Sequence, residues 1–376
     1  MDTRDIIFRK YVGLILCSSF FCHGSEIVCD GLTYSAEGDN RAILTGYDPG
    51  VLSKNSPNGV VVIPEYVGEF KTVGIGNRAF MGCDKISYVL CSDSVEWIGD
   101  KAFFECQNMI DFEFMHAKTM FQGPHTSRSS LRRIGSSAFC GCRRLSRMIL
   151  PESLEYIGES AFSKCSHLSC VDFPQSLMHV GILSFEWCDK LDNVCIPKNV
   201  NDDVYLAFVY NRSISSFEVS RDNHNYQSID GALYDKKSRA LLIWPRSSAS
   251  EVVELPDDVT MIAPYAFSQC KNIREVRFCQ NIAYIGDGAF AECGITNAVL
   301  PVNLRQVEER TFYGCTNLIE VTIPRSVTYI ATNAFSYCSS MSKITVQGNN
   351  KLLIGVDLPM ECKMHVQEIG KGERWR

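Results

Sequence analysis

Cysteine is the potentially reactive residue that recurs most regularly in this 376-residue chain. Nine times, a phenylalanine that follows Ala, Ser or Thr is itself followed three residues later by a cysteine. The nine cysteines of this ladder are Cys83, Cys106, Cys142, Cys165, Cys188, Cys270, Cys293, Cys315 and Cys338. Cysteines can form disulfides or bind zinc, and their spacing bears on both possibilities.

A zinc site has little support in this spacing. Cys140 and Cys142 form a Cys-x-Cys pair, but the chain contains no Cys-x-x-Cys pair. Because a ladder cysteine recurs once per interval beside a phenylalanine, it suits a small, buried apolar position. Stacked units would nevertheless place neighbouring cysteines about 5 Å apart, within the Cα range of a disulfide. The sequence favours buried thiols and leaves bridged cysteines as the alternative.

The sequence contains none of the common catalytic or phosphate-binding motifs. Its seven histidines form no His-x-x-x-His pair, and there is no Gly-x-Ser-x-Gly elbow and no Gly-x-x-x-x-Gly-Lys loop. The richest polar cluster, residues 222–231, lacks the spacing of a calcium-binding EF-hand loop. Its Asp230-Gly231 pair instead predicts a turn of a β-hairpin that includes residues 232–234 and 240–244. We therefore expect no enzymatic activity, no cofactor and no bound metal.

The intervals between successive ladder cysteines indicate a repeat of about 23 residues. They are 23, 36, 23, 23, 82, 23, 22 and 23 residues long, and a fixed period in this range is typical of a stacked solenoid. Adding 23 to Cys188 leads to Asn211, which likewise stands three residues after a phenylalanine. We therefore predict ten repeats, one of which carries Asn in place of Cys. Two intervals are still longer than the 23-residue period, which predicts insertions of 13 residues before Cys142 and 36 residues before Cys270.

A second pattern precedes each phenylalanine and predicts the secondary structure of a repeat. In the repeat that begins at Leu145, apolar residues stand at offsets 0, 3, 5, 9 and 12. Offsets 3 and 5 alternate as in a β-strand, and Pro151 at offset 6 ends the strand because it has no N–H to donate. Gly158 then suits a tight turn. We expect each repeat to contain a strand, a proline corner, a short extended stretch, a glycine turn and a brief helical turn.

This order of strand, proline, glycine and Ala-Phe-x-x-Cys resembles the BspA-like leucine-rich repeats, over about residues 60–346. The resemblance implies a strand-rich α/β repeat protein: a right-handed leucine-rich-repeat solenoid of about 23-residue units with a parallel β-sheet on its concave face. Stacking buries apolar side chains that no single repeat could bury alone. Family members are commonly secreted or surface proteins, some of them adhesins for host matrix proteins, so the resemblance also implies a binding role.

The N-terminus predicts an export signal. Arg4, Arg9 and Lys10 precede a short apolar run, so we expect residues 1–24 to be a signal peptide. The alternative is that this segment forms a first buried strand. The run is too short to span a bilayer, and no later segment resembles a membrane span. A secreted or cell-surface location follows from the first interpretation.

The remaining segments predict one solenoid with a cap at each end. We expect a capping hairpin over residues 25–59, with strands at 27–34 and 41–47 around a polar turn. The solenoid would occupy residues 60–346, with insertions near 115–130 and 220–250. Residues 347–376 would form the C-terminal cap and tail, since solenoid ends expose apolar surface that needs covering.

The candidate binding residues are the strand positions at offsets 2 and 4, whose side chains would point away from the core. The whole row comprises Tyr88, Leu90, Asp111, Glu113, Arg147, Ile149, Cys170, Asp172, Asn193, Cys195, Ser216, Glu218, Glu275, Arg277, Asn297, Val299, Glu320 and Thr322. The favoured contact residues within it are Tyr88, Leu90, Asp111, Glu113, Arg147, Asp172, Asn193, Glu218, Glu275, Arg277 and Glu320. Acidic members outnumber basic ones, which predicts a protein ligand with a partly basic surface. The insertions are a second candidate, because loops that interrupt a repeat often carry specific contacts.

These observations predict a non-enzymatic adhesion module, secreted or at the cell surface, that binds an extracellular-matrix or host cell-surface protein through the solenoid face. The net charge of −6 and the lack of a basic cluster argue against nucleic acid or an anionic membrane as the partner. The alternative is an intracellular leucine-rich-repeat scaffold for protein–protein interaction. A third hypothesis places a hydrolase or carbohydrate-binding site in the long insertion.

Overall fold

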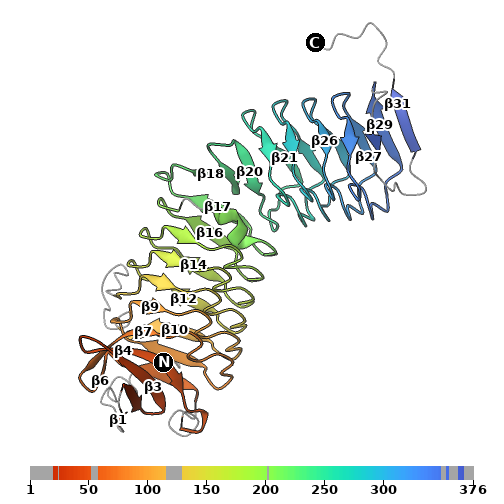
Figure 1. The fold of residues 1–376 in the computed structure, drawn as a ribbon. Helices are drawn as coiled ribbons and strands as arrows, with labels where there is room; N and C mark the ends of the chain where they lie inside the picture. Colours follow the sequence, from red (N-terminus) through yellow and green to blue (C-terminus); the bar gives the residue numbers. More distant parts are fainter. Residues whose placement is uncertain are drawn as a thin grey trace. The chain divides into compact units, whose positions relative to one another are not determined.

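The computed structural model describes residues 20–23, 25–51, 58–115, 129–200, 203–348, 353–354 and 363–367. The chain divides into two compact units, Met1–Asn211 (unit 1) and Arg212–Arg376 (unit 2). Each unit is built mainly from short strands joined by turns (Figure 1), and unit 1 also contains the 3-10 helix η3 (Val204–Phe208). Most of the predicted signal peptide lies outside the described residues.

The first strand of each repeat in unit 1 lies in a parallel sheet, as the offsets predict. These strands are β5 (Val60–Ile63), β8 (Tyr88–Cys91), β10 (Asp111–Phe114), β12 (Arg147–Ile149) and β14 (Cys170–Asp172), and β16 (Asn193–Ile196) is the equivalent strand of the next repeat. Equal offsets are in register, because Asp111 faces Tyr88 in β8 and Arg147 in β12. The sheet therefore lines up one residue per repeat at each offset.

The extended stretches after the proline corner form a second parallel sheet in unit 1. It comprises β7 (Phe70–Ile75), β9 (Trp97–Ile98), β11 (Arg133–Ile134), β13 (Tyr156–Ile157) and β15 (His179–Val180), with β6 (Tyr66–Val67) paired to β7. Most of these strands are two residues long, because a glycine turn follows at once. Those glycines are required by close packing: a Cβ on Gly158 would lie 2.6 Å from the backbone nitrogen of Ser136.

Four antiparallel strands extend this second sheet at the N-terminal end of unit 1. They are β1 (Phe20–His23), β2 (Glu26–Cys29), β3 (Leu32–Glu37) and β4 (Arg41–Tyr47). The prediction of one strand over residues 27–34 was wrong, because Asp30 and Gly31 adopt positive φ and turn the chain between β2 and β3. β4 then pairs in parallel with β7, so these strands adjoin the first repeat.

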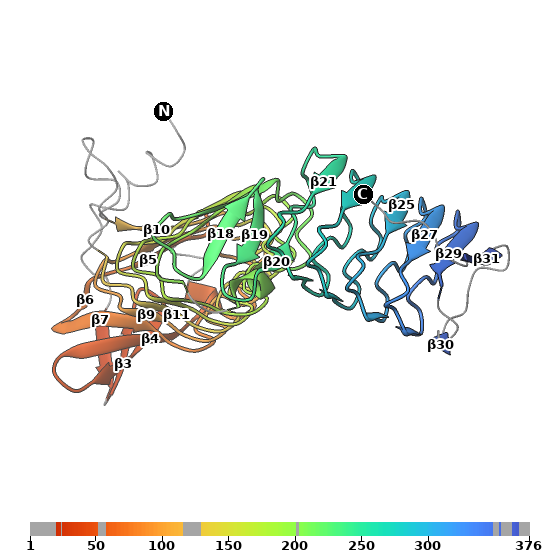
Figure 2. The same ribbon diagram turned by 90° about the horizontal axis from the view of Figure 1, so that it is seen from above.

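Unit 2 contains the same two sets of strands, one from the start of each repeat and one from the stretch after the proline corner. First strands are β17 (Ser216–Val219), β21 (Val252–Glu254), β23 (Glu275–Arg277), β25 (Asn297–Val299), β27 (Glu320–Ile323), β29 (Lys343–Gln347) and β31 (Lys363–Gln367). Second strands are β20 (Ala240–Ile243), β22 (Met261–Ile262), β24 (Tyr284–Ile285), β26 (Gln306–Val307), β28 (Tyr329–Ile330) and β30 (Leu353–Ile354). In Figure 2, β25, β27 and β29 lie side by side, as their parallel pairing requires.

The long insertion predicted before Cys270 contains the expected hairpin. β18 (Tyr226–Ile229) pairs antiparallel with β19 (Ala232–Asp235), and β19 pairs antiparallel with β20. Asp230 and Gly231 form the tight turn between β18 and β19, with φ of 51° and 76°. Because β20 also pairs in parallel with β22, the insertion connects directly to the regular ladder.

A column of stacked aromatic rings forms the core of each unit. In unit 1 it runs from Tyr47 through the repeat phenylalanines to Phe208, with ring centroids 5.1–5.5 Å apart. In unit 2 it runs from Trp244 to Phe335, with spacings of 4.9–5.5 Å. Apart from Tyr47, which is half-buried, these rings are almost completely buried. The parallel stacking of equivalent residues gives each repeat neighbours that no isolated repeat would have.

Trp244 shows that the predicted count of ten repeats was one too low. It stands 23 residues before Phe267 and stacks on it, so it takes the position of the repeat phenylalanine. The predicted 36-residue insertion therefore consists of one 23-residue repeat and 13 further residues. Sequence inspection missed this repeat because Trp replaces Phe and Ser247 replaces the ladder cysteine.

The nine ladder cysteines are buried thiols rather than disulfides. In unit 1, Cys106, Cys142, Cys165 and Cys188 each donate a hydrogen bond to the phenylalanine carbonyl of the preceding repeat, at 3.1–3.2 Å. Cys315 and Cys338 make the same bond in unit 2, at 2.9 and 3.0 Å. The S–H proton thus satisfies a buried carbonyl, which a disulfide could not do. Cys29 in β2 differs, because it is disulfide-bonded.

Asn211 occupies the cysteine position of the last repeat of unit 1, as the spacing predicts. Its Nδ2 donates to the carbonyls of Phe185 and Phe208, both at 2.9 Å, and its Oδ1 accepts from the Cys188 N–H at 2.7 Å. The bond to Phe185 reproduces the one that a ladder thiol makes. Asparagine is therefore a chemical substitute for cysteine at this position.

Candidate protein-binding surface

The offset-2 and offset-4 side chains of unit 1 lie on one face of its first sheet. We call Tyr88, Glu113, Arg147, Cys170, Asp172, Asn193 and Cys195 the strand face of unit 1. Exposure increases along this face: Tyr88 and Glu113 are half-buried, whereas the other five residues are exposed. The more exposed part thus combines a cation, an anion, an amide and two cysteines.

Two predicted members of this face are buried, which corrects the sequence-based selection. Leu90 is 5% exposed and Asp111 is 3% exposed. Leu90 lies in register between Val62 and Glu113, and the short Asp111 side chain lies between Tyr88 and Arg147. Side chains on the adjacent strands limit solvent access to both, because those strands are about 4.8 Å away. Neither residue is available to a partner in this structure.

Unit 2 presents the equivalent surface on β21, β23, β25, β27 and β29. We call Val252, Glu254, Glu275, Arg277, Asn297, Val299, Glu320, Thr322, Lys343 and Thr345 the strand face of unit 2. The predicted residues Glu275 and Arg277 are exposed and adjacent on β23, and Glu320 is half-buried on β27. The predicted Glu218 is exposed on β17, outside this set.

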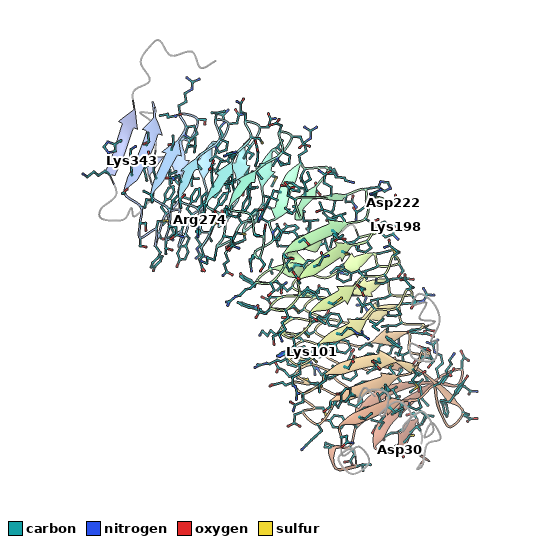
Figure 3. All side chains as sticks on the ribbon, turned by 180° about the vertical axis from the view of Figure 1, so that it is seen from behind. Asp30, Lys101, Lys198, Asp222, Arg274 and Lys343 are labelled. Carbon is teal, nitrogen blue, oxygen red and sulfur yellow. The ribbon has the colours of Figure 1, made fainter. Side chains whose placement is uncertain are left out.

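Ion pairs engage several charges on the strand face of unit 2. The Arg277 Nε donates to the Glu275 Oε1 at 2.9 Å, and the Lys343 Nζ donates to the Glu320 Oε1 at 2.6 Å. The hydrogen bond from Lys343 lowers the pKa of Glu320, and a second bond from Thr345 acts in the same direction. Lys343 is labelled in Figure 3 on β29. Glu275 and Glu320 are thus each paired with a cation within this face, whereas Glu254 adds a further exposed carboxylate.

Sequence inspection missed four residues of this face that the structure places beside the predicted ones. Lys343 and Thr345 could have been found, because Met341 stands 23 residues after Leu318 and begins another repeat. Val252 and Glu254 were harder to find from the sequence pattern, because their repeat begins inside the predicted insertion.

The two insertions contribute differently to the candidate surface. The first, residues 117–130, lies almost entirely outside the described residues. In the second, the buried Asn223 Oδ1 accepts hydrogen bonds from the backbone N–H groups of Asn225 and Tyr226. The Ser228 hydroxyl donates to the carbonyl of Phe217 at 2.7 Å. These contacts hold the hairpin to its own unit and give its polar cluster a structural role.

Metal binding and membrane insertion have no structural indication within the described ranges. No group of three or more His, Cys, Asp or Glu side chains there could hold a metal ion. No helix among those residues is both long enough and apolar enough to cross a bilayer.

The family model of the BspA type leucine rich repeat region matches six copies along the chain, over residues 67–126, 124–237 and 246–357. The chain belongs to the BspA-type leucine-rich repeat family. This confirms the resemblance found in the sequence and the strand-rich solenoid fold. BspA-type repeat proteins are a protein-interaction and surface-protein family, so the membership supports a binding role without naming a ligand.

Solved structures share this BspA-type fold at low sequence identity. A leucine rich cell surface protein from Faecalibacterium prausnitzii is 22% identical, with a TM-score of 0.62 over 88% of this chain and 96% of that one. The pneumococcal vaccine antigen PcpA is 19% identical, with a TM-score of 0.69 over 93% and 94%. A leucine-rich repeat protein from Eubacterium ventriosum is 17% identical, with a TM-score of 0.51 over 88% and 90%. No curated protein matches the chain significantly.

Proposed function

We propose that this protein is a non-enzymatic adhesion module, secreted or at the cell surface, that binds an extracellular-matrix or host cell-surface protein through its strand faces. The observation that carries the proposal is the row of exposed and chemically varied side chains, Arg147, Asp172 and Asn193, on the first strands of three successive repeats over a stacked core. Registered rows of this kind form broad binding surfaces in other solenoids. The similar Faecalibacterium prausnitzii protein is a cell surface protein, which supports the proposed location.

The strand face of unit 1 is the favoured contact region. Arg147 and Asp172 are both exposed there, whereas ion pairs already engage Glu275 and Glu320 in unit 2. Exposed charges contribute to partner choice and association rate when they meet complementary charges. A protein ligand that offers both an acidic and a basic group to this face fits the arrangement.

The test is binding of the purified full chain to immobilised collagen, laminin and fibronectin, with a double variant Arg147→Glu and Asp172→Lys. We expect at least one of the immobilised proteins to bind the chain and to bind the variant about tenfold more weakly, a change of about 1.4 kcal/mol. The matched control exchanges Glu275→Arg and Arg277→Glu, which preserves charge and pairing. Binding of the chain to none of these proteins, or equal binding by all three forms of the chain, would contradict the proposal.

Location needs a separate experiment. N-terminal sequencing of the protein recovered from its own cells and culture medium should show loss of the first residues and an extracellular fraction. An intact Met1 in a cytosolic fraction would favour the intracellular scaffold instead.

A further inference from the structure

The outer edge of the repeats in unit 1 changes its chemistry between the fourth and the fifth repeat. Three positions define this edge: the residue after the glycine turn, the next residue, and the second residue after the phenylalanine. In the first four repeats they are polar, charged or glycine: Asn77, Arg78 and Gly82; Asp100, Lys101 and Glu105; Ser136, Ser137 and Gly141; Glu159, Ser160 and Lys164. Lys101 is labelled in Figure 3.

The last two repeats of unit 1 carry large apolar or aromatic residues at the same three positions. We call these six residues the apolar edge patch: Ile182, Leu183 and Trp187, followed by Tyr205, Leu206 and Tyr210. Ile182 is 45% exposed and Tyr210 is 41% exposed, and the other four are half-buried. The rings of Trp187 and Tyr210 stack with centroids 5.3 Å apart. The patch therefore presents apolar surface to solvent where four earlier repeats present none.

The folding of the repeats does not require these side chains. Leu183, Trp187 and Tyr210 adopt φ values of 56°, 57° and 62°, in the left-handed region that bulky residues disfavour. Gly82 and Gly141 occupy the third edge position in two other repeats, with φ of 73° and 78°. The aromatic column beneath, including Phe185 and Phe208, is buried in the same way as in the polar-edged repeats. A role outside folding explains why large side chains stand at these unfavourable positions.

The charged residues next to the patch are mainly acidic. Glu159 precedes Ile182 by one repeat, and Glu186 lies between Phe185 and Trp187 in sequence and accepts a hydrogen bond from the Ser163 hydroxyl. Asp203 is exposed and close enough to Tyr205 to reinforce the rise in the tyrosine pKa that burial causes. Lys164 is the cation at the third edge position of the preceding repeat. The rim thus carries more negative than positive charge.

We propose that the apolar edge patch docks a partner protein segment that presents apolar side chains flanked by lysine or arginine. Aromatic and aliphatic side chains surrounded by a charged rim are the usual composition of a protein-binding hot spot. The acidic rim favours basic flanks on the partner. A second copy of this chain fits less well, because its own acidic rim would meet the first. An anionic membrane would be repelled for the same reason. The patch shares no residue with the strand face of unit 1.

The test replaces the patch with the residues that the preceding repeat already carries: Ile182→Glu, Leu183→Ser and Trp187→Lys. Ser160 and Lys164 have φ values of 54° and 62° at these positions, so the backbone accepts the substitutions. Circular dichroism and a thermal melt check that the variant folds. A single variant, Tyr210→Ser, provides a second disruption of the patch. The control, Val302→Ser, removes an apolar side chain outside both strand faces that is 59% exposed in unit 2.

The probes are three dye-labelled amphipathic model peptides with the same pattern: leucine with lysine, leucine with glutamate, and serine with lysine. Fluorescence anisotropy should show that the leucine–lysine peptide binds the full chain at least tenfold more tightly than the other two. Both patch variants should lose at least tenfold in affinity for it, whereas Val302→Ser should change this affinity less than twofold. The strand-face variant Arg147→Glu with Asp172→Lys should bind this peptide normally.

Four results would overturn the proposal. The first is unchanged peptide binding by both patch variants, and the second is equal binding of the leucine–glutamate peptide. The third is a concentration-dependent dimer that light scattering detects for the native chain but not for the patch variant, since a second copy would then cover the patch. The fourth is sedimentation with phosphatidylcholine vesicles that requires the patch, in the absence of peptide binding.

Discussion

The strand faces of the two units are built on the same core and differ in how their charges are used. On unit 2, Arg277 pairs with Glu275, and Lys343 pairs with Glu320. On unit 1, Arg147 and Asp172 are exposed on neighbouring strands at different offsets. The repeat determines where side chains point, and the residues at its variable positions determine whether charges are satisfied internally. Repeats of the same kind can thus carry one surface on which most charges are paired and another on which the charges are exposed.

The two units also depart from the repeat pattern in different ways. The last repeat of unit 1 replaces the ladder cysteine with Asn211, which makes three hydrogen bonds. The first aromatic of the unit 2 column is Trp244, whose indole N–H is buried and has no hydrogen-bond partner among the described residues. The first exception satisfies its polar groups and the second leaves one unsatisfied. Substitutions at Asn211 and Trp244 therefore compare a residue whose polar groups are hydrogen-bonded with one whose indole N–H is not.

The largest effect is expected for Trp244→Ala. Removing a fully buried aromatic side chain from the column should lower the free energy of unfolding by about 3–5 kcal/mol. Trp244→Phe restores the residue of the other repeats and removes the unsatisfied N–H, while leaving a small void. These effects oppose each other, so its change should stay within about 1 kcal/mol. Urea denaturation followed by circular dichroism measures both. A loss from Trp244→Phe as large as that from Trp244→Ala would show that the indole nitrogen is needed.

The next effect concerns Asn211. Asn211→Ala leaves the carbonyl of Phe185 without its side-chain donor, and we expect a loss of about 2–4 kcal/mol in the free energy of unfolding. Asn211→Cys supplies an S–H donor as in the other repeats, so it should cost only about 1 kcal/mol. Equal losses from the two variants, measured by the same denaturation experiment, would contradict the view that Asn substitutes for the ladder thiol.

A smaller and gradual effect is expected at alkaline pH. Burial raises the pKa of Cys293 from 9.0 to about 11 and that of Cys106 to about 12. The folded chain therefore holds these thiol protons more tightly than the unfolded chain does. This contribution to stability is complete below pH 9 and is lost as the pH rises through 11 and 12. The urea midpoint should fall between pH 8.5 and about pH 10.5.

The control for this pH dependence removes one titrating thiol. Cys293→Ala should be less stable at pH 8.5, yet its urea midpoint should fall less steeply with pH than that of the native chain. Identical slopes for the two proteins would mean that thiols are not responsible for the alkaline loss.

The smallest effect is expected for the ion pairs of unit 2. Lys343→Ala removes a pair between partly exposed groups, and it should lower the free energy of unfolding by less than about 1 kcal/mol. The effect should shrink further in 1 M NaCl because salt screens exposed charges. Thermal melts at low and high salt measure both. A large, salt-insensitive loss would show that the two strand faces differ in structure and not only in surface charge.

Much of the fold could be predicted from the sequence, because each repeat is defined by features close together in the chain. Its proline, glycine, phenylalanine and cysteine residues each suit one position in the repeat. The proline and glycine positions predicted the corners and turns, and the 23-residue interval predicted Asn211 as a repeat position. Trp244 escaped detection because two of its repeat's marker residues differ from the pattern. The single strand predicted over residues 27–34 was wrong because Asp30 and Gly31 turn the chain.

The candidate surface was less predictable, since exposure depends on neighbours that the sequence does not place side by side. Period-2 alternation assigned Leu90 and Asp111 to the outer face, but their neighbours on adjacent strands bury them. The pairing of Glu320 with Lys343 joins residues 23 positions apart. Such contacts follow from the register of the sheet.

The sequence by itself determined the repeat, its strand and turn positions, and the residue that each repeat contributes to the core. These features depend on short-range rules: alternation in a strand, the missing N–H of proline, and the recurrence of Phe and Cys at one interval. The tertiary structure decided which strand residues reach solvent, which charges pair, that the ladder cysteines are thiols bonded to carbonyls, and that Trp244 begins the column in unit 2. Those outcomes depend on which atoms lie within a few ångströms after stacking, and an interval along the chain does not contain that information.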